Sequence, residues 1–100
     1  MAKKLSPLHP GGVLREEFLA PLGLSSGELA KAMGVPRTRV ERIAAETSGI
    51  TADTALRLSK TLGTSAQLWL NLQNHYDIET AEREIGKTLN KIKRVNRNAA

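Results

Sequence analysis

The sequence of 100 residues contains no cysteine, and no apolar run approaches the length of a membrane span, which takes about 20 residues. The absence of cysteine excludes a disulfide scaffold, thiolate metal ligands and a cysteine nucleophile, and it fits a reducing compartment. The first residues, MAKKLSPLHPGG, lack the apolar segment and the cleavage site of a signal peptide. We therefore expect a soluble cytoplasmic protein with one small domain and a tail, and no contact with a membrane.

An excess of one charge sign is also lacking over most of the chain. The formal net charge is +5, yet residues 1–86 contain ten basic and ten acidic side chains. The excess comes from a C-terminal stretch without acids, at Lys87, Lys91, Lys93, Arg94 and Arg97. Bulk charge therefore says little about the domain itself, and a binding surface must be inferred from where single residues lie.

Glycine and proline divide the chain into segments with helical periodicity, and no strong β-branched alternation typical of a strand occurs between them. Serine and threonine before such segments can cap helices, proline suits a first turn, and glycine can end a helix. We expect helices from about 11 to 20 ended by Pro21 and Gly23, from Ser25 to Gly34, from Pro36 to Ala44, from Thr51 to Gly63, and from Ser65 onward.

The sequence GELAKAMGVPRTRVERI, residues 27–43, interrupts two of these helices with a Gly-Val-Pro break. A short turn crosses two helices steeply, and the crossing requires small or well-fitted apolar residues at the contact. Ala30 allows a close approach, and Gly34 can adopt the left-handed conformation of a tight exit. Leu29, Val40 and Ile43 complete the expected scaffold. This spacing predicts a helix-turn-helix, whose second helix enters the major groove of DNA.

Polar residues at the start of the second helix are the candidate base contacts. Arginine suits the two acceptors of guanine, and a threonine methyl can touch the methyl of thymine. We expect base contacts from Arg37, Thr38, Arg39 and Arg42, the last with either a base or a phosphate. The helix N-terminus at Ser25 and Ser26 is expected to bind a backbone phosphate. The alternative is an ordinary helical hairpin whose arginines form a solvated face.

A second apolar stripe follows, with steps of three, four, four and three residues: Ile78, Ala81, Ile85, Leu89 and Ile92. It either folds back on the domain or pairs with a second copy or a partner protein. Because dimers of this motif read palindromic operators, we expect a homodimer, with its contact within residues 68–92. The basic tail from Lys91 to Arg97 either contacts phosphates or is a frayed, solubilising end.

Candidates for enzymatic chemistry are few. His9 and His75 are far apart in the sequence without metal-ligand spacing, so capping or surface roles are favoured for both. Glu16 and Glu17 are adjacent and would point about 100° apart on a helix, which does not suit an acid-base pair. Trp69 fits a core position better than a stacking platform. We expect no enzyme activity, no cofactor and no metal site.

These motifs resemble those of the HigA-type antitoxins, which belong to the Xre and lambda-repressor-like helix-turn-helix group and include plasmid-maintenance antidote proteins. The resemblance covers roughly residues 8–80 and rests on three blocks: HPGGVLREEFLAPLGLS, LAKAMGVPRTRVERI and GITADTALRLSKTLGTSAQLWLNLQNHYDIE. It implies an all-α fold, with a five-helix DNA-binding domain over residues 1–76, its reading unit at about 25–45, and a C-terminal amphipathic helix with a basic tail over 77–100.

The resemblance also implies a function. A protein of this type binds operator DNA as a dimer, represses its own operon and neutralises a toxin similar to HigB, an mRNA-cleaving ribonuclease. Ser26 matches a phosphate or base contact of the family, and Arg37, Thr38 and Arg39 match its base readers.

The chain departs from the family at two places. Glu46 lies in a loop that is commonly basic in the family, where its charge would repel a phosphate, and Gly27 replaces a bulkier residue and should weaken its helix slightly.

Two functions stay open besides the antitoxin. One is a stand-alone Xre-type regulator without a toxin. The other is an interaction module that does not bind DNA, for which alanine at Arg37 and Arg39 would leave DNA affinity unchanged.

Overall fold

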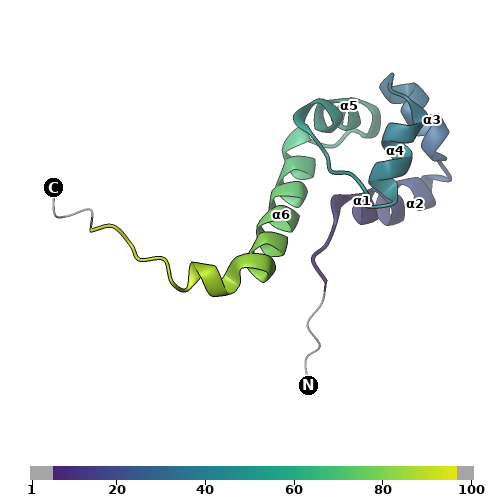
Figure 1. Cartoon of the computed structure of the whole chain (residues 1–100). Coiled ribbons are helices and arrows are strands. Elements are labelled where there is room, and N and C mark those ends of the chain that lie inside the picture. The colour runs from purple at the N-terminus through teal and green to yellow at the C-terminus, as the bar shows by residue number, and fades with distance from the viewer. Residues whose placement is uncertain (1–5, 97–100) are drawn as a thin grey trace.

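The computed structural model describes residues 6–96, and helices are the only regular elements among them (Figure 1). Residues 1–5 and 97–100, which include Arg97 of the basic tail, lie outside the described part. The elements in chain order are α1 (Pro10–Val13), the π-helical η1 (Leu14–Leu19), α2 (Ala20–Leu22), α3 (Ser26–Met33), α4 (Arg37–Ala44), α5 (Ala52–Leu62) and α6 (Ala66–Leu89). Because α1, η1 and α2 form one continuous run, residues 6–96 contain five helices in space, and the all-α five-helix prediction is confirmed.

The first helical run is longer than its sequence suggests. We expected it to end at about Ala20, but it continues through Pro21 to Leu22 and ends at Gly23, whose φ is 60°. Proline in a regular helix clashes with the carbonyl four residues earlier. Here the amide of Ala20 bonds to the carbonyl of Arg15, five residues back, so the widened π turn makes room for the proline ring.

The expected caps set the ends of the other helices. Ser25 and Glu28 form a capping box, in which the Glu28 amide donates to Ser25 Oγ (3.0 Å) and the Ser25 amide donates to Glu28 Oε1 (2.9 Å). Gly34 and Gly63 end α3 and α5 in the left-handed conformation, with φ of 74° and 75°. One boundary differs. Pro36 is extended (ψ 144°) and precedes the helix as its N-cap residue, so α4 begins at Arg37 rather than at the proline.

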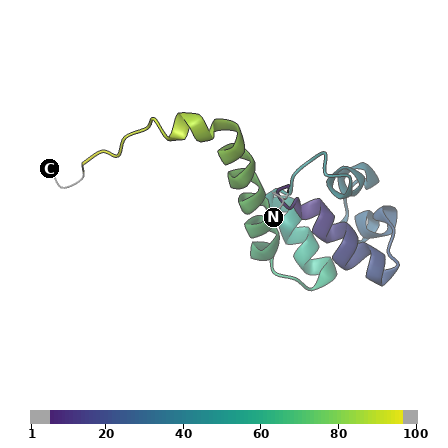
Figure 2. The ribbon, with the colours of Figure 1, turned by 90° about the horizontal axis from the view of Figure 1, so that it is seen from below.

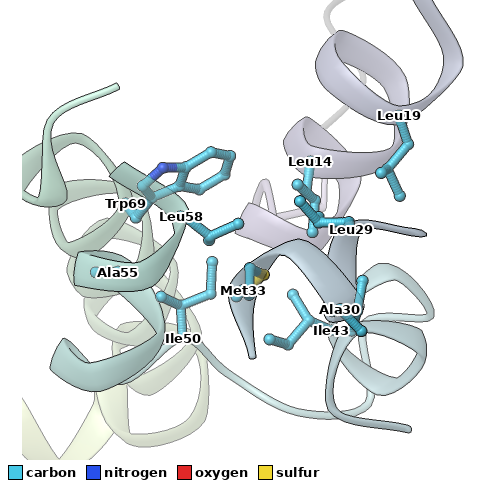
Figure 3. Close-up of a cluster of buried hydrophobic side chains, with 11 residues drawn as sticks. Leu14, Leu19, Leu29, Ala30, Met33, Ile43, Ile50, Ala55, Leu58 and Trp69 are labelled. Atoms are coloured by element: carbon cyan, nitrogen blue, oxygen red, sulfur yellow. The ribbon is translucent and has the colours of Figure 1, made fainter. Parts of the chain in front are cut away.

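One apolar core joins η1, α3, α4, α5 and the first turn of α6 (Figure 3). Trp69 lies at the α6 side of this core and is completely buried. Its indole Nε1 donates to Thr64 Oγ1 (2.7 Å), and its ring centroid lies 5.4 Å from that of Phe18. The core position predicted for Trp69 is confirmed. The buried apolar side chains are Leu14, Leu19, Leu29, Ala30, Met33, Val40, Ile43, Ile50, Ala55, Leu58 and Trp69.

The distal half of α6 points away from this core (Figures 1 and 2). Backbone dihedrals at Ile85 (φ −115°, ψ 16°) are not helical and mark a kink near the end of the helix. The apolar stripe on this segment is exposed, with Ile78 at 61% and Ile85 at 46% of their full accessibility. The alternative in which the stripe folds back on the domain is therefore wrong.

Among the helices of residues 6–96, none combines the length and the hydropathy that a membrane span requires.

Candidate nucleic-acid interface

Helices α3 and α4 and the turn between them form a rigid unit. The turn is closed by a hydrogen bond from the Val35 amide to the Ala30 carbonyl (3.0 Å), next to the left-handed Gly34. Ala30, Val40 and Ile43 are each 1% exposed, so the inner faces of the two helices are fully packed. The predicted scaffold residues therefore meet at one crossing, with Leu29 buried beside them.

The His-Pro-Gly segment at the start of α1, residues 9–11, packs against the C-terminal end of α4. The His9 ring accepts a hydrogen bond from the Gly11 amide through Nδ1 (2.8 Å), so His9 is a buried N-cap of α1. Its ring meets that of Tyr76 edge-on, with centroids 4.7 Å apart. A Cβ atom on Gly11 would lie only 1.7 Å from the backbone oxygen of Ile43. The glycine is therefore required for the close approach of α1 to the end of the second helix of the unit.

The outer face of α4 presents the predicted base-contacting side chains. Arg37 is 71% exposed and forms an ion pair with Glu41 one turn later (3.3 Å). Thr38 and Arg42 are exposed, and Arg39 is partly exposed. All four project from the solvent side of the helix that the core holds from within. This is the arrangement in which a helix can enter a groove of DNA.

Gly27 has a role that the sequence did not reveal. A Cβ atom there would lie 3.2 Å from Cδ of Arg37. The glycine thus leaves room for the aliphatic stem of Arg37 against the first turn of α3. Glycine at this position costs helix propensity, but it also opens the space that Arg37 occupies.

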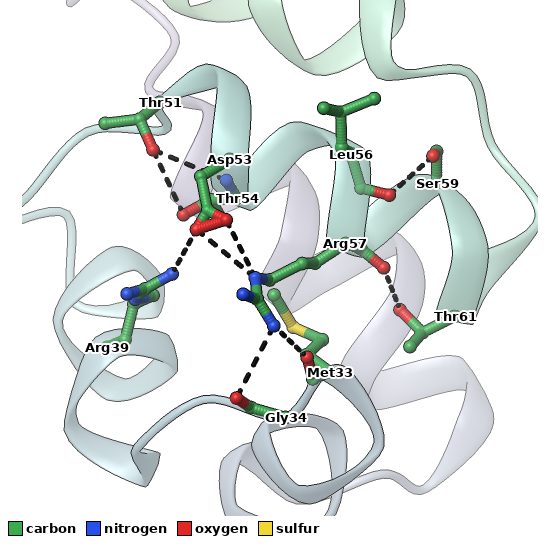
Figure 4. Close-up of polar contacts among 10 residues, drawn as sticks. All are labelled: Met33, Gly34, Arg39, Thr51, Asp53, Thr54, Leu56, Arg57, Ser59 and Thr61. Carbon is green, nitrogen blue, oxygen red and sulfur yellow. Dashed lines mark hydrogen bonds and ion pairs between the residues drawn. The ribbon is translucent and has the colours of Figure 1, made fainter.

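Arg39 is held by residues outside the helix-turn-helix (Figure 4). Its Nη1 contacts Asp53 Oδ2 on α5 (3.0 Å), and Arg57 Nε contacts Asp53 Oδ1 (2.8 Å). Arg57 Nη1 in turn donates to the carbonyl of Met33 (2.9 Å) at the end of α3. The hydrogen bonds from Arg57 and then from Arg39 lower the pKa of the Asp53 carboxyl below its usual value. Sequence reasoning missed Asp53 and Arg57, although their i,i+4 spacing in α5 was a local signal.

The N-terminus of α3 is the predicted phosphate site, and its polar groups are partly in use. The Ser25 hydroxyl caps the Glu28 amide, and the Glu28 carboxylate takes the Ser25 amide. Hydrogen bonding to the Glu28 carboxylate by the Ser25 amide, and less by the Ser25 side chain, lowers the pKa of Glu28. No described acceptor is bonded to the amides of Ser26 and Gly27 in the first turn of the helix. These two amides and the Ser26 side chain are therefore available to an anion, and the Ser25 hydroxyl, which is an acceptor in its capping bond, can still donate to one.

The loop after α4 contains Glu46, the acidic residue that we expected to repel a phosphate. Glu46 adopts a positive φ of 65°, which is uncommon for a residue other than glycine. Its carboxylate pairs with Arg15 (3.2 Å), which also donates to the Ala44 carbonyl (2.5 Å). Hydrogen bonds to Glu16 and Glu46 raise the pKa of Arg15. Glu46 thus has a cationic partner in Arg15, which it shares with Glu16.

The surrounding residues also fix the second end of that loop. The amide of Ile50 donates to Gln73 Oε1 of α6 (2.6 Å), and a Cβ atom on Gly49 would lie 2.9 Å from the same oxygen. The loop is therefore attached to the first helix through Arg15 and to α6 through Gln73. Both ends of the loop between α4 and α5 are held in place by groups distant in the sequence.

Comparison with known proteins gives a consistent set of relatives. The helix-turn-helix family model HTH_3 matches residues 14–69. Virulence-associated protein I of Dichelobacter nodosus is 51% identical over 81 residues, which cover 81% of this chain and 75% of that protein. Antitoxin HigA-1 of Vibrio cholerae serotype O1 is 39% identical over 75 residues, which cover 75% of this chain and 70% of that protein. The structure of Pseudomonas aeruginosa antitoxin HigA with the higBA promoter superposes with a TM-score of 0.86 at 42% identity, covering 90% of this chain and 99% of that one.

Proposed function

This chain belongs to the HTH_3 helix-turn-helix family and to the HigA antitoxins within it, and from this membership we propose that it binds the operator of its own operon, represses that operon and neutralises a HigB-like ribonuclease toxin. The observation that carries the DNA-binding part is the exposed first turn of α4, which displays Arg37, Thr38 and Arg39 on a fully packed helix-turn-helix. The relative solved with the higBA promoter supports DNA as the ligand of this face.

The proposed contacts divide into base readers and phosphate binders. Arg37, Thr38 and Arg39 read base edges, and Arg42 contacts a base or a phosphate one turn further along α4. Ser25 and Ser26 hold a backbone phosphate through the N-terminus of α3, where the helix dipole favours an anion. The free amides of Ser26 and Gly27 support this contact, and the nearby Glu28 carboxylate opposes it. We therefore expect the arginines of α4 to contribute more to affinity than the serines.

A homodimer follows from the proposed operator. A palindromic site requires two copies of α4 about one helical turn of DNA apart. The exposed stripe of α6, namely Ile78, Ala81, Ile85 and Leu89, is the apolar face without a covering element within residues 6–96, and Ile92 continues it beyond the helix end. We assign this face to a second copy of the chain. The toxin then binds elsewhere on the dimer.

The DNA-binding proposal is tested with alanine at single positions. Arg37→Ala and Arg39→Ala should each weaken binding to the DNA segment upstream of the gene by about 1–3 kcal/mol, or roughly 5- to 150-fold. Lys60→Ala removes one positive charge from an exposed position on α5, outside the proposed contacts, and serves as the control. Fluorescence anisotropy of a labelled duplex at fixed salt measures the affinities. Equal, small effects of all three substitutions would show that α4 does not read bases.

The antitoxin part is tested by co-purification. The tagged chain is expressed together with the gene beside its own, and the expected result is a stable complex in which ribonuclease activity towards mRNA is suppressed. Failure of the neighbouring product to bind, with DNA binding retained, would leave a stand-alone regulator.

A further inference from the structure

The carboxylate of Asp53 connects three helices at the reading face. It lies in the first turn of α5, outside the helix-turn-helix, and contacts Arg39 of α4 (3.0 Å) and Arg57 of α5 (2.8 Å). Arg57 continues the chain of contacts to the Met33 carbonyl at 2.9 Å, and more weakly to that of Gly34 at 3.5 Å. Figure 4 shows that the two guanidinium groups lie beside each other on the same side of the carboxylate, and both contact its Oδ2. The position of Asp53 is thus fixed by the end of α3, independently of Arg39.

The two outer arginines of α4 are oriented in different ways. Arg37 is 71% exposed, and its ion pair within residues 6–96 is with Glu41 of its own helix. Arg39 is 39% exposed and pairs with a carboxylate on a different helix, 14 residues away in the sequence. A pair within one exposed helix turn leaves a long side chain with much of its freedom, whereas a partner that is itself anchored restricts it. Arg39 is therefore the pre-ordered member of the pair.

Pre-ordering matters for specificity because a free arginine can also reach phosphates. A guanidinium held in one direction before DNA arrives loses less conformational freedom when it forms a bidentate contact with one base. The same carboxylate reduces the positive charge on the face towards DNA, and this charge determines binding to any sequence. One acidic side chain thus favours specific contacts and opposes non-specific ones.

We propose that Asp53 is a specificity-determining residue that acts through Arg39, aligning it for a base contact and disfavouring its use as a general phosphate contact. The proposal rests on the proposed function, because it needs a preferred DNA sequence. Asp53 itself does not touch DNA. Arg57 is the positioning residue that holds Asp53 against the end of α3.

The test uses two DNA probes. The first is the duplex that the wild-type protein selects from a randomised library, and the second is a shuffled duplex of equal length and composition. Asp53→Asn removes the charge with little change in shape. We expect the ratio of the affinity for the selected duplex to that for the shuffled duplex to fall about fivefold or more. Binding to the shuffled duplex itself should be equal or tighter. Its salt dependence on the shuffled duplex should steepen by up to about one unit of slope. Glu17→Gln, an exposed residue on η1, changes the net charge equally and should leave the ratio unchanged.

A second comparison isolates the action through Arg39. In the Arg39→Ala background, Asp53→Asn should cause no further fall in the ratio, since the side chain to be aligned is gone. Repeating the selection with the Asp53→Asn protein should flatten base preference at the positions that Arg39→Ala also flattens, and leave the others intact. Both readouts compare different DNA sequences bound to the same protein. Partial unfolding therefore lowers all affinities by the same factor and changes neither the ratio nor the base preference.

The outcomes separate the two proposals. A wild-type protein that binds both duplexes equally would refute the proposed function itself. A wild-type protein that discriminates, with an unchanged ratio in Asp53→Asn, would refute only the role of Asp53. An equal fall of the ratio with and without Arg39 would also overturn it, because Asp53 would then act by another route.

Discussion

Residues 9–72 and residues 77–96 contain apolar side chains at the same helical spacing, but these side chains are buried in the first region and exposed in the second. In the packed domain, residues 9–72, the apolar faces of successive helices meet around Trp69 and Leu58, which are completely buried. In the C-terminal arm, residues 77–96, the stripe from Ile78 to Leu89 is exposed. Periodicity alone therefore predicts that a helix has an apolar face, but it does not predict whether another element of the chain covers that face.

Charge differs between the same two regions. Arg15 and Arg39 of the packed domain are each paired with a carboxylate of another element, Glu46 and Asp53 respectively. The arm carries four cations after its last acid, Lys87, Lys91, Lys93 and Arg94, and all are exposed. Charges such as these fix the geometry of the domain, whereas the arm exposes its apolar stripe and the four cations that follow its last acid.

The largest effect is expected at the centre of the packed domain. Trp69→Ala should lower the free energy of unfolding by about 3–5 kcal/mol, because it leaves a large cavity between α5, α6 and the first helical run. A small domain has only about 5–15 kcal/mol in total, so the variant should be partly unfolded at moderate temperature. Urea unfolding followed by circular dichroism measures the change. A loss under about 1 kcal/mol would mean that the core around Trp69 collapses to fill the space.

A smaller effect separates two glycines, one from each region. Gly11→Ala should cost about 1–3 kcal/mol, because the new methyl group meets the Ile43 carbonyl and the backbone must move. Gly86→Ala in the arm meets no atom within 4 Å and should be neutral or stabilise by up to about 1 kcal/mol. Thermal melting of both variants under one condition checks the difference. The contrast between the regions would be weakened by similar melting temperatures.

The exposed stripe should matter for association rather than for folding. The double substitution Ile78→Ser and Ile85→Ser should change the unfolding free energy of separated protomers by no more than about 0.5 kcal/mol, because these side chains contact little of the domain. It should shift the protein from dimer to monomer in sedimentation equilibrium, and weaken binding to a palindromic duplex. A dimer that survives the change would assign the two-fold contact to another face.

The local parts of this structure were predictable from the sequence, and the non-local parts were not. Ser25, Thr51 and Ser65 accept hydrogen bonds from amides three residues later, and Gly34 and Gly63 end helices, as expected from chemistry within one turn. Such signals lie within a few residues of their effects, so a single sequence contains them.

The contacts that position α4 join residues far apart in the chain. The approach of Gly11 to Ile43 and the pairing of Arg39 with Asp53 depend on how whole helices pack, and no short motif encodes them. The π turn before Pro21 and the kink at Ile85 were also missed, because the apolar spacing runs on through both positions. The base and phosphate contacts of the candidate interface stay predictions until they are tested with DNA.

The smallest expected effect concerns two surface carboxylates of the packed domain, Glu28 and Asp53. Their pKa values in the folded protein are lowered, by the capping bonds to Ser25 and by the hydrogen bonds from Arg57 and Arg39 respectively. They therefore contribute stability that is fully present above the unfolded-state pKa values of about 4 and is lost as the pH falls through the lower folded-state values. The melting temperature of the wild type should fall between about pH 5 and pH 3, and the fall should be shallower in Glu28→Gln and Asp53→Asn. At pH 6 both variants should melt slightly below the wild type, since water screens exposed pairs. Parallel curves for all three proteins would show that the pKa values of Glu28 and Asp53 are the same in the folded and unfolded states, and that their bonds add nothing to stability.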